Sequence, residues 1–387
     1  VGFYSWSILK WLYPSYKDIL HGFTYNGHAY IIAFTLFSLG TCFYAYHRFK
    51  VVKTANLLVA PLFLWLIICG LLAVYLKGAA FFIVPLFSFL VALYVHINQK
   101  NPNPFLLVFL GIPALFILSP FVKMFPVGLG LKMMVATTLL TTLIFFLLLP
   151  LITKYRQKAA LAFLSFLLFA GFMASAHMQS NFTKESPKPT SLLYVLNVDE
   201  EKAMWATYEN VLSDWTSQYI TNKNYVDSTL TKNTISSKYG SNFTYTNKAP
   251  LKEVPTPNID IQFDTVIGSI RQLRVCITPN RAINRLEVFT NEVAILKADV
   301  NGIELSEYYL KNRGNGKLIT HYISDIVYTE LNLEIPLGAK LELTVYEASN
   351  DLLSNALFTI PQRKENEIPM PFILNDAILT IQKVKFD

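Results

Sequence analysis

The hydrophobic pattern divides the chain into two parts of different character. Over residues 28–177, long apolar runs alternate with short polar loops, whereas polar and apolar residues are mixed from Gln179 onward. The clearest run, residues 133–152 (MMVATTLLTTLIFFLLLPLI), carries no charge and would reach about 30 Å as a helix. The basic and tyrosine side chains of residues 154–158, which follow this run, are typical of a membrane interface.

The first part is predicted to be a polytopic helical bundle over residues 28–177, with about six membrane-spanning helices. They cover roughly residues 28–46, 55–76, 79–97, 104–121, 130–152 and 159–177. Pro113 and Pro120 interrupt the fourth run, and Lys123 is expected to end it. Such breaks are tolerated where neighbouring helices cover the freed backbone groups.

Residues 1–27 are aromatic and apolar, but Lys10, Pro14 and Asp18 interrupt them. They predict an amphipathic helix that lies in the membrane interface, and the end of a span cut off upstream is the alternative. Because no initiator Met precedes Val1, the chain is expected to begin inside a longer protein or after a cleavage.

Basic residues in the short loops predict the orientation of the spans. Seven lie on one side of the predicted membrane: Arg48, Lys50, Lys53, Lys100, Lys154, Arg156 and Lys158. Three lie on the other side: Lys77, Lys123 and Lys132. The side with seven should be cytoplasmic. With an even number of spans, residues 1–27 and the C-terminal part are then expected outside the cytoplasm.

A polar linker is predicted over residues 178–190, followed by an extracytoplasmic domain over residues 191–387. This domain should begin with a strand at 191–198 and continue with an amphipathic helix from about Asp199 to Ile220, capped by Asn197 or Asp199. Large apolar residues recur in this stretch at spacings of three and four: Trp205, Tyr208, Leu212, Trp215 and Tyr219. They predict a stripe that packs on a sheet, and a ligand platform is the alternative.

The rest of the domain is predicted to be a loop followed by strands. Residues 221–258 are rich in Asn, Thr, Ser and Lys, and predict a long irregular loop with room for a short hairpin. From Ile259 onward, short β-branched runs are separated by turn signals such as Asn301-Gly302 and Asn315-Gly316. This regular spacing predicts a mainly antiparallel β-sandwich.

The charge distribution narrows the classes of function. The chain has a net charge of +7, but residues 1–177 carry +11 and residues 178–387 carry −4. The basic residues therefore belong to membrane loops, and no nucleic-acid partner is predicted. The three cysteines, Cys42, Cys69 and Cys276, are interpreted as small buried apolar residues, not as a disulfide or zinc framework.

Few candidate catalytic groups occur in the apolar part. No acidic residue lies between Asp18 and Glu185, which argues against an ion-coupled carrier or an intramembrane aspartyl protease. The histidines fall at the predicted ends of spans and are expected to reach water, with a proton relay as the alternative: His28, His47, His96 and His177. The threonines of the fifth span are expected to serve helix packing and bonds to nearby carbonyls, ahead of a substrate path: Thr137, Thr138, Thr141 and Thr142.

The polar part is equally sparse in catalytic motifs. Glu200-Glu201 resembles the paired glutamates of some zinc exopeptidases, but no His-x-Asp partner occurs in the chain. The pair also stands where a helix start favours acids. His321 alternates with apolar neighbours and is interpreted as a strand residue. No catalytic, cofactor-binding or metal-binding residue is therefore predicted in this chain.

The order of parts and several segments resemble the C-terminal portion of membrane-bound zinc exopeptidases. The segments are SLLYVLNVDEEKAMWAT, NRLEVFTNEVAILKADVNGIEL, KLITHYISDIVYTELNLEIP and YEASNDLLSNALFTIP. The family meant is the aminopeptidase-Y-like family, in its transmembrane branch with the endoplasmic-reticulum metallopeptidases and their bacterial relatives. These motifs are structural, so no metal ligand or catalytic residue is carried over to this chain.

The resemblance implies a membrane-anchoring and C-terminal portion of a zinc-dependent exopeptidase. Its peptidase domain, with the zinc, would lie upstream of this chain. The implied location is a bacterial inner membrane or the endoplasmic reticulum, with the C-terminal domain periplasmic or lumenal. Besides the lipid bilayer, the implied partners are that peptidase domain and other envelope proteins. A non-enzymatic scaffold or accessory subunit of an envelope complex is the alternative, and a transporter ranks third.

Overall fold

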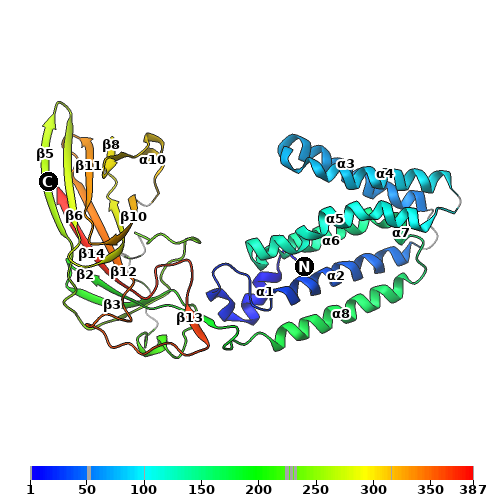
Figure 1. Cartoon of the computed structure of the whole chain (residues 1–387), viewed down its shortest axis with the longest axis horizontal. Coiled ribbons are helices and arrows are strands. Elements are labelled where there is room, and N and C mark those ends of the chain that lie inside the picture. Colours follow the sequence, from blue (N-terminus) through cyan, green and yellow to red (C-terminus); the bar gives the residue numbers. More distant parts are fainter. Residues whose placement is uncertain are drawn as a thin grey trace. The chain divides into compact units, whose positions relative to one another are not determined.

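The structure, a computed structural model, describes residues 2–49, 54–99, 101–222, 226, 230, 233–314 and 316–386. The chain divides into two compact units, Val1–Phe182 and Thr183–Asp387. The first unit is helical and the second is built mainly of strands (Figure 1). The predicted order of a helical part followed by a β domain is therefore confirmed.

The helical unit contains α-helices and short 3-10 segments. In chain order they are α1 (Ser5–Leu12), η1 (Pro14–Asp18), α2 (Gly27–Arg48), α3 (Thr54–Tyr75), η2 (Lys77–Phe82), α4 (Ile83–Asn98), α5 (Pro104–Leu129), η3 (Leu131–Met133), α6 (Met134–Leu147), α7 (Leu149–Ile152) and α8 (Lys158–Met178). The closest packing joins α2 to α8 and α5 to α6. Trp65 of α3 lies fully buried in the core of this unit, and its indole N–H donates to the Leu143 carbonyl of α6 at 3.3 Å.

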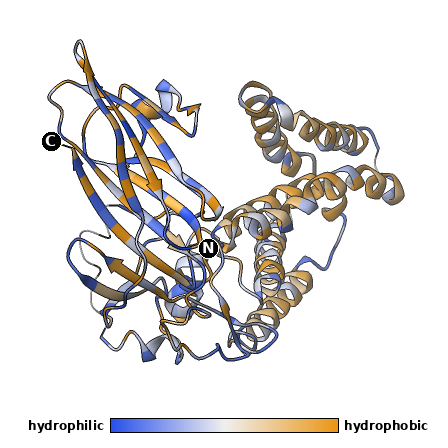
Figure 2. Cartoon of the chain, turned by 60° about the vertical axis from the view of Figure 1, so that its left-hand side comes forward, coloured by the Kyte–Doolittle hydropathy of each residue, from blue (hydrophilic) through white to orange (hydrophobic). Residues whose placement is uncertain are grey.

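Within the described residues, five helices are long and apolar enough to cross a membrane. They cover Gly27–Arg48, Asn56–Tyr75, Lys77–Asn98, Pro104–Leu129 and Lys158–Met178. Figure 2 shows apolar residues on most turns of these helices, whereas the strands alternate in hydropathy. Many large apolar side chains face outward, such as Phe63, Phe116 and Phe163, which are 62%, 79% and 70% exposed. Apolar surface of this extent is costly in water, so a lipid environment accounts for it.

The predicted single helix over residues 130–152 is wrong, because the structure divides it. Helix α6 ends at Leu147, and α7 begins at Leu149 with Pro150 in its first turn. A proline has no N–H to donate, and its ring clashes with the carbonyl four residues earlier, which ends the preceding helix. His96 of α4 supports the break, because its Nε2 lies 2.7 Å from the Pro150 carbonyl oxygen and donates to it.

The predicted end of the fourth span near Lys123 is also wrong. Helix α5 passes through three internal prolines and continues to Leu129. Pro126 has no N–H for the Val122 carbonyl four residues earlier. The hydroxyl of Thr137, on the neighbouring helix α6, donates to that carbonyl at 2.8 Å. A side chain from the adjacent helix thus replaces the missing backbone donor, and α5 remains continuous.

The other threonines of α6 bond within their own helix. Thr141 donates to the Thr137 carbonyl at 2.7 Å, and Thr142 to the Thr138 carbonyl at 2.9 Å. Thr138 donates to the Val135 carbonyl at 3.0 Å. The prediction that these threonines serve helix packing and backbone bonding is confirmed.

The prediction of one interfacial helix over residues 1–27 is wrong in its extent. Only α1 and the short η1 form there, and the chain then turns back onto the bundle. Leu9 and Tyr16 are buried against α2, η3 and α8. Asp18 and Asn26 are buried as well, and Asn26 donates to the Ala176 carbonyl at 2.7 Å. The segment therefore closes one end of the helical unit, where Asn26 bonds to the backbone of α8.

The β unit contains two large sheets and one small one. Its elements are β1 (Lys188–Thr190), β2 (Leu193–Asn197), β3 (Lys202–Thr207), η4 (Thr216–Gln218), β4 (Tyr245–Lys248), β5 (Asn258–Ile267), β6 (Ile270–Thr278), β7 (Ile283–Thr290), β8 (Lys297–Val300), β9 (Ile303–Glu304), α10 (Glu307–Asn312), β10 (Lys317–Asp325), β11 (Thr329–Pro336), β12 (Leu341–Ser349), β13 (Glu367–Pro369) and β14 (Ala377–Phe386). The seven-stranded sheet has the order β10-β7-β12-β14-β2-β3-β4, and the five-stranded sheet has the order β5-β6-β11-β8-β9. Pairing is antiparallel except between β14 and β2 and between β1 and β13.

Residues from both large sheets share one core. Val275 and Leu333 of the five-stranded sheet are buried in the same cluster as Val288 and Val345 of the seven-stranded sheet. A second cluster covers β2 and β3 and contains Trp205 and Trp215, with Leu212 and Tyr219 partly buried against it. The predicted mainly antiparallel pairing is confirmed, and two sheets that share a core fit the sandwich interpretation.

The predicted helix from Asp199 to Ile220 is wrong. Its first half is a hairpin, in which β3 pairs antiparallel with β2, and the only helical segment described there is the three-residue η4. In KAMWAT, Ala203 and Trp205 point to the same core, so the period is that of a strand. The aromatic residues of the predicted stripe are buried or half-buried, as expected for packing residues, but different elements present them.

Other details of the prediction are resolved by the strand bounds. β1 lies inside the predicted linker over residues 178–190, so the linker ends earlier than predicted. In the predicted loop 221–258, β4 pairs with β3, while residues 223–225, 227–229 and 231–232 lie outside the described residues. The Asn301-Gly302 turn is confirmed, with φ angles of 50° and 80° between β8 and β9. Asn315 lies outside the described residues.

Replacing Thr137 by valine should destabilise the packing of α5 on α6. Valine keeps the side-chain shape but leaves the buried Val122 carbonyl without its donor, at a cost of about 1 kcal/mol. The measurement is the melting temperature of the full chain in detergent, together with hydrogen exchange of the α5 amides near Pro126. Thr141→Val is the matched control, since the buried Thr141 hydroxyl donates to the Thr137 carbonyl of its own helix. Equal effects of the two substitutions would contradict the role assigned to Thr137.

Candidate functional site

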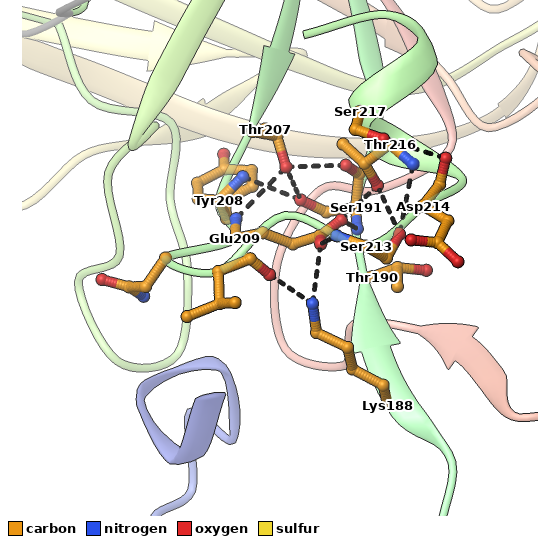
Figure 3. A network of polar contacts seen from close by, with 12 residues as sticks. Lys188, Thr190, Ser191, Thr207, Tyr208, Glu209, Ser213, Asp214, Thr216 and Ser217 are labelled. Atoms are coloured by element: carbon orange, nitrogen blue, oxygen red, sulfur yellow. Dashed lines mark hydrogen bonds and ion pairs between the residues drawn. The ribbon is translucent and has the colours of Figure 1, made fainter. Parts of the chain in front are cut away.

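A buried carboxylate, Glu209, holds the segment that follows β3 (Figure 3). Its side chain is inaccessible to solvent. The backbone N–H of Ser191 donates to Oε1 at 3.0 Å, and the N–H of Ser213 donates to Oε2 at 2.8 Å. The hydroxyl of Thr216 donates to Oε1 as well. These donors come from the link between β1 and β2, from the segment after β3 and from η4, so one side chain joins three parts of the chain.

Lys188 completes this network from β1. Its Nζ lies 3.3 Å from Glu209 Oε2 and also donates to the Val211 carbonyl. β1 itself runs parallel to β13. The ion pair therefore fixes the first strand of the β unit to the segment after β3. Because both carboxylate oxygens are engaged and shielded from water, the arrangement is a structural anchor and not a reactive centre.

A second buried carboxylate, Glu287, lies on the outer face of the seven-stranded sheet. The backbone N–H of Ser236 lies 3.0 Å and 3.2 Å from its two oxygens. Arg285 Nε donates to it at 2.7 Å, and Lys317 Nζ lies 2.7 Å away. Glu287 thereby holds the backbone of residues 233–237 against the sheet.

A cleft of about 570 Å³ opens beside this cluster. Its lining consists of Ser236, Ser237, Lys238, Asn284, Arg285, Tyr322, Asn350, Phe372, Ile373, Leu374 and Asn375. The lining includes two cations and no acid. Lys238 Nζ lies 4.7 Å from the centre of the Phe372 ring, and Arg285 Cζ lies 5.4 Å from the centre of the Tyr322 ring. The cleft is therefore an electropositive hollow with aromatic walls, suited to a ligand that carries negative charge and apolar groups.

A third buried carboxylate, Glu347 on β12, has poorer partners. Arg281 Nε lies 3.1 Å from Oε1, but among the described residues neither oxygen of Glu347 accepts a well-aligned hydrogen bond. Burial raises the pKa of Glu347 from its ordinary 4.5 to about 7, against the opposing effect of the Arg281 charge. The β unit thus contains a carboxyl group that titrates near neutral pH.

The sequence candidates do not converge on a site. Glu200 and Glu201 lie in the exposed turn between β2 and β3, where Glu201 has a φ of 50° and Glu200 pairs with Lys202 at 2.8 Å. His321 is on β10, as predicted for a strand residue, and its Nδ1 lies 2.9 Å from the Thr329 hydroxyl. Burial lowers the pKa of His321, which favours the neutral ring.

The three cysteines, and the four histidines expected at the ends of spans, lie near where the sequence predicts. Cys42 and Cys276 are buried and Cys69 is half-buried, and all three are free thiols. The four histidines fall near helix ends, at both ends of α2 and at the ends of α4 and α8. His177 Nδ1 lies 2.7 Å from the Tyr13 hydroxyl. Within the described ranges, no group of three or more His, Cys, Asp or Glu side chains could hold a metal ion.

Sequence reasoning missed Glu209, Glu287 and the cleft. Only the lysines and asparagines of residues 221–258 hinted at a polar surface, and nothing in that composition indicates which strands they face. Comparison with known proteins adds no assignment. No family model, no curated protein and no solved structure matches this chain.

Replacing Glu209 by glutamine should destabilise the start of the β unit. The substitution removes the buried charge that pairs with Lys188 and turns one acceptor into a donor that faces donors, at a cost of about 3 kcal/mol. The measurement is hydrogen exchange of the amides of residues 207–217 and of β1. As a control, Glu200→Gln removes a solvent-exposed pair and should leave exchange unchanged. Protection that survives Glu209→Gln would contradict the anchoring role.

Glu347 should make the stability of β12 depend on pH. The folded protein binds the Glu347 proton more tightly than the unfolded chain, because the folded pKa is raised. This stabilisation is complete below pH 4.5 and is lost as the pH rises through about 7. Between pH 5 and pH 8, β12 should lose about 2–3 kcal/mol of protection against hydrogen exchange, after correction for intrinsic rates.

Glu347→Gln should abolish this dependence, because glutamine does not titrate. Glu342→Gln, a partly exposed glutamate on the same strand, should retain it. A wild-type profile that is flat across this range, or that matches the profile of Glu347→Gln, would contradict the assignment.

Proposed function

We propose that this chain is the membrane-anchoring and C-terminal extracytoplasmic part of a zinc-dependent exopeptidase. The observation that carries the proposal is the position of the family-like segments in the fold. SLLYVLNVDEEKAMWAT forms β2 and β3 with the turn between them, and KLITHYISDIVYTELNLEIP forms β10 and β11. These segments are framework strands, so the likeness concerns the architecture of the whole β unit.

The helical unit fits the role of an anchor. Five apolar helices are long enough to span, and η3, α6 and α7 together supply the sixth span of the proposal. The proposed orientation places Arg48 and residues 154–158 in the cytoplasm and the β unit outside it. Lys50, Lys53 and Lys100, which contribute to the same count, lie outside the described residues.

In this proposal the zinc and its ligands belong to a peptidase domain outside this chain. A zinc-bound water would attack the first peptide bond of the substrate there. The residues of this chain would position that peptidase domain at the membrane. The Lys188–Glu209 pair would fix the first strand of the β unit firmly at the point where the chain leaves the membrane part.

A scaffold in an envelope complex is the second candidate, and the edge strand β5 favours it. β5 is an outermost strand of the five-stranded sheet. Ile261, Phe263 and Val266 on it are 50%, 45% and 51% exposed. An exposed apolar edge strand is a surface on which a partner chain can add a strand.

Spheroplasts that express the complete reading frame should release the N-terminal residue of an added peptide. A charged pentapeptide does not cross the membrane, so hydrolysis by intact spheroplasts tests the reaction and the orientation together. Release of the free amino acid is measured by mass spectrometry. A zinc chelator should abolish it and added zinc should restore it, because the metal activates the water.

The N-acetylated form of the same peptide is the control, since an exopeptidase of this kind needs a free amino terminus. Hydrolysis only after lysis would refute the orientation. A complete frame without a His-x-Asp and Glu-Glu signature, or without zinc-dependent activity, would refute the exopeptidase and favour the scaffold.

A further inference from the structure

The cleft beside β7 offers several hydrogen-bond donors that the described part of the chain leaves unused. The Lys238 ammonium contacts only aromatic rings. Arg285 uses Nε and Nη2 for Glu287 and the Ser236 carbonyl, which leaves Nη1 without a partner although the residue is 7% exposed. The side-chain amide nitrogens of Asn284 and Asn350 have no described partner either, and both asparagines line the same cleft.

The charge balance of the cleft favours one anionic group. Glu287 carries one negative charge against the two positive charges of Arg285 and Lys317, with which it pairs, so this side of the cleft keeps an excess positive charge. Lys238 has no carboxylate partner among the described residues, and no acid lines the cleft. A ligand carboxylate there would gain charge-assisted hydrogen bonds that the protein does not supply itself.

Two aromatic side chains stand in the wall of the cleft with much of their surface in water. Tyr322 is 70% exposed and Phe372 is 44% exposed. Phe372 adopts a φ of 70°, a left-handed conformation that is costly for an aromatic residue. Its carbonyl accepts from the Lys238 N–H at 3.1 Å, and this bond helps to hold the ring at the cleft. The rings offer an apolar surface next to the anionic position.

The cleft also borders a strand edge. Tyr322 belongs to β10, which is the outermost strand of the seven-stranded sheet and pairs with β7 on one side. No strand pairs with its other side in the described part of the chain. An extended peptide can add its main chain to such an edge, whereas a saccharide has no matching row of amide groups.

We propose that this cleft binds the C-terminal end of a peptide with a free α-carboxylate. The carboxylate lies between Lys238 and Arg285, the C-terminal side chain packs on Phe372 and Tyr322, and the asparagine amides bind the last peptide groups. The inference does not rest on the proposed exopeptidase activity, because it concerns binding to this chain alone.

The test uses the full chain in detergent, with a chelator present to exclude hydrolysis. The probe is a pentapeptide of four alanines and a C-terminal phenylalanine, labelled with fluorescein at its N-terminus and followed by fluorescence polarisation. Its C-terminal amide should bind at least about tenfold more weakly than the free acid, since the amide lacks the charge.

Variants assign the binding to the cleft. Lys238→Met keeps the apolar stem and should weaken binding of the free acid by about tenfold, with little further effect on the amide. Lys238→Arg should retain the preference for the acid. Tyr322→Ala should weaken both probes. Lys340→Met, at an exposed lysine outside the cleft lining, is the matched control and should bind like the wild type. Unchanged melting temperatures exclude loss of folding as the cause.

Equal affinity for acid and amide would overturn the proposal, and so would an absence of binding by either. Tighter binding of trigalacturonate than of the pentapeptide acid would also overturn it and would assign the cleft to an acidic saccharide. Peptide binding that Lys238→Met leaves unchanged would place the binding site elsewhere on the chain. None of these outcomes bears on hydrolysis by intact spheroplasts, so the two proposals fail separately.

Discussion

A polar group that leaves water without a partner is costly, and this constraint shapes both units of the chain, with Glu347 as a poorly paired exception. In the helical unit the constraint applies to backbone carbonyls that prolines affect. The Thr137 hydroxyl donates to the Val122 carbonyl, four residues before Pro126, and His96 Nε2 donates to the Pro150 carbonyl. In the β unit the constraint applies to the buried carboxylate of Glu209, which accepts hydrogen bonds from separate parts of the chain. Each such group selects one arrangement of the chain, because the alternatives would leave it buried and unpaired. The polar contacts therefore specify the packing that the apolar residues stabilise.

The sequence predicts those elements whose determinants are local. Apolar runs of sufficient length predict the long helices, and Asn301-Gly302 predicts its turn because both residues tolerate positive φ. The prediction fails over residues 199–220, where aromatic spacings of three and four imitate a helix. The strand there depends on pairing with β2, and the turn after it depends on Glu209, which receives donors from Ser191 and Ser213. Partners that are distant in the sequence leave no local pattern.

The candidate sites are harder to predict for the same reason. The cleft unites residues of five separate stretches, near positions 237, 284, 322, 350 and 373, and no spacing rule connects them. Conversely, Glu200-Glu201 looks like a catalytic pair in the sequence but lies in an exposed turn, where Lys202 is the partner of Glu200. Adjacency in the sequence does not show that two acids share a site in the folded protein. A binding surface on a sheet is assembled from neighbouring strands, whose order the sequence does not state.

The register of strand pairing decides which buried carboxylates of the β unit act as fixed anchors and which titrate. Tyr346 lies opposite Glu287 in the β12–β7 pairing, and Glu347 is the next residue along β12. Strand alternation therefore places Glu287 on the outer face, among Arg285, Lys317 and the covering segment, while Glu347 shares the core face with Val345. The outer face offers cations and backbone donors, and the core face offers apolar side chains and one poorly aligned guanidinium. A difference of one residue in register thus gives the two carboxylates different roles. Glu287 holds the covering segment, and with it the wall of the cleft, whereas burial of Glu347 disfavours its charged form.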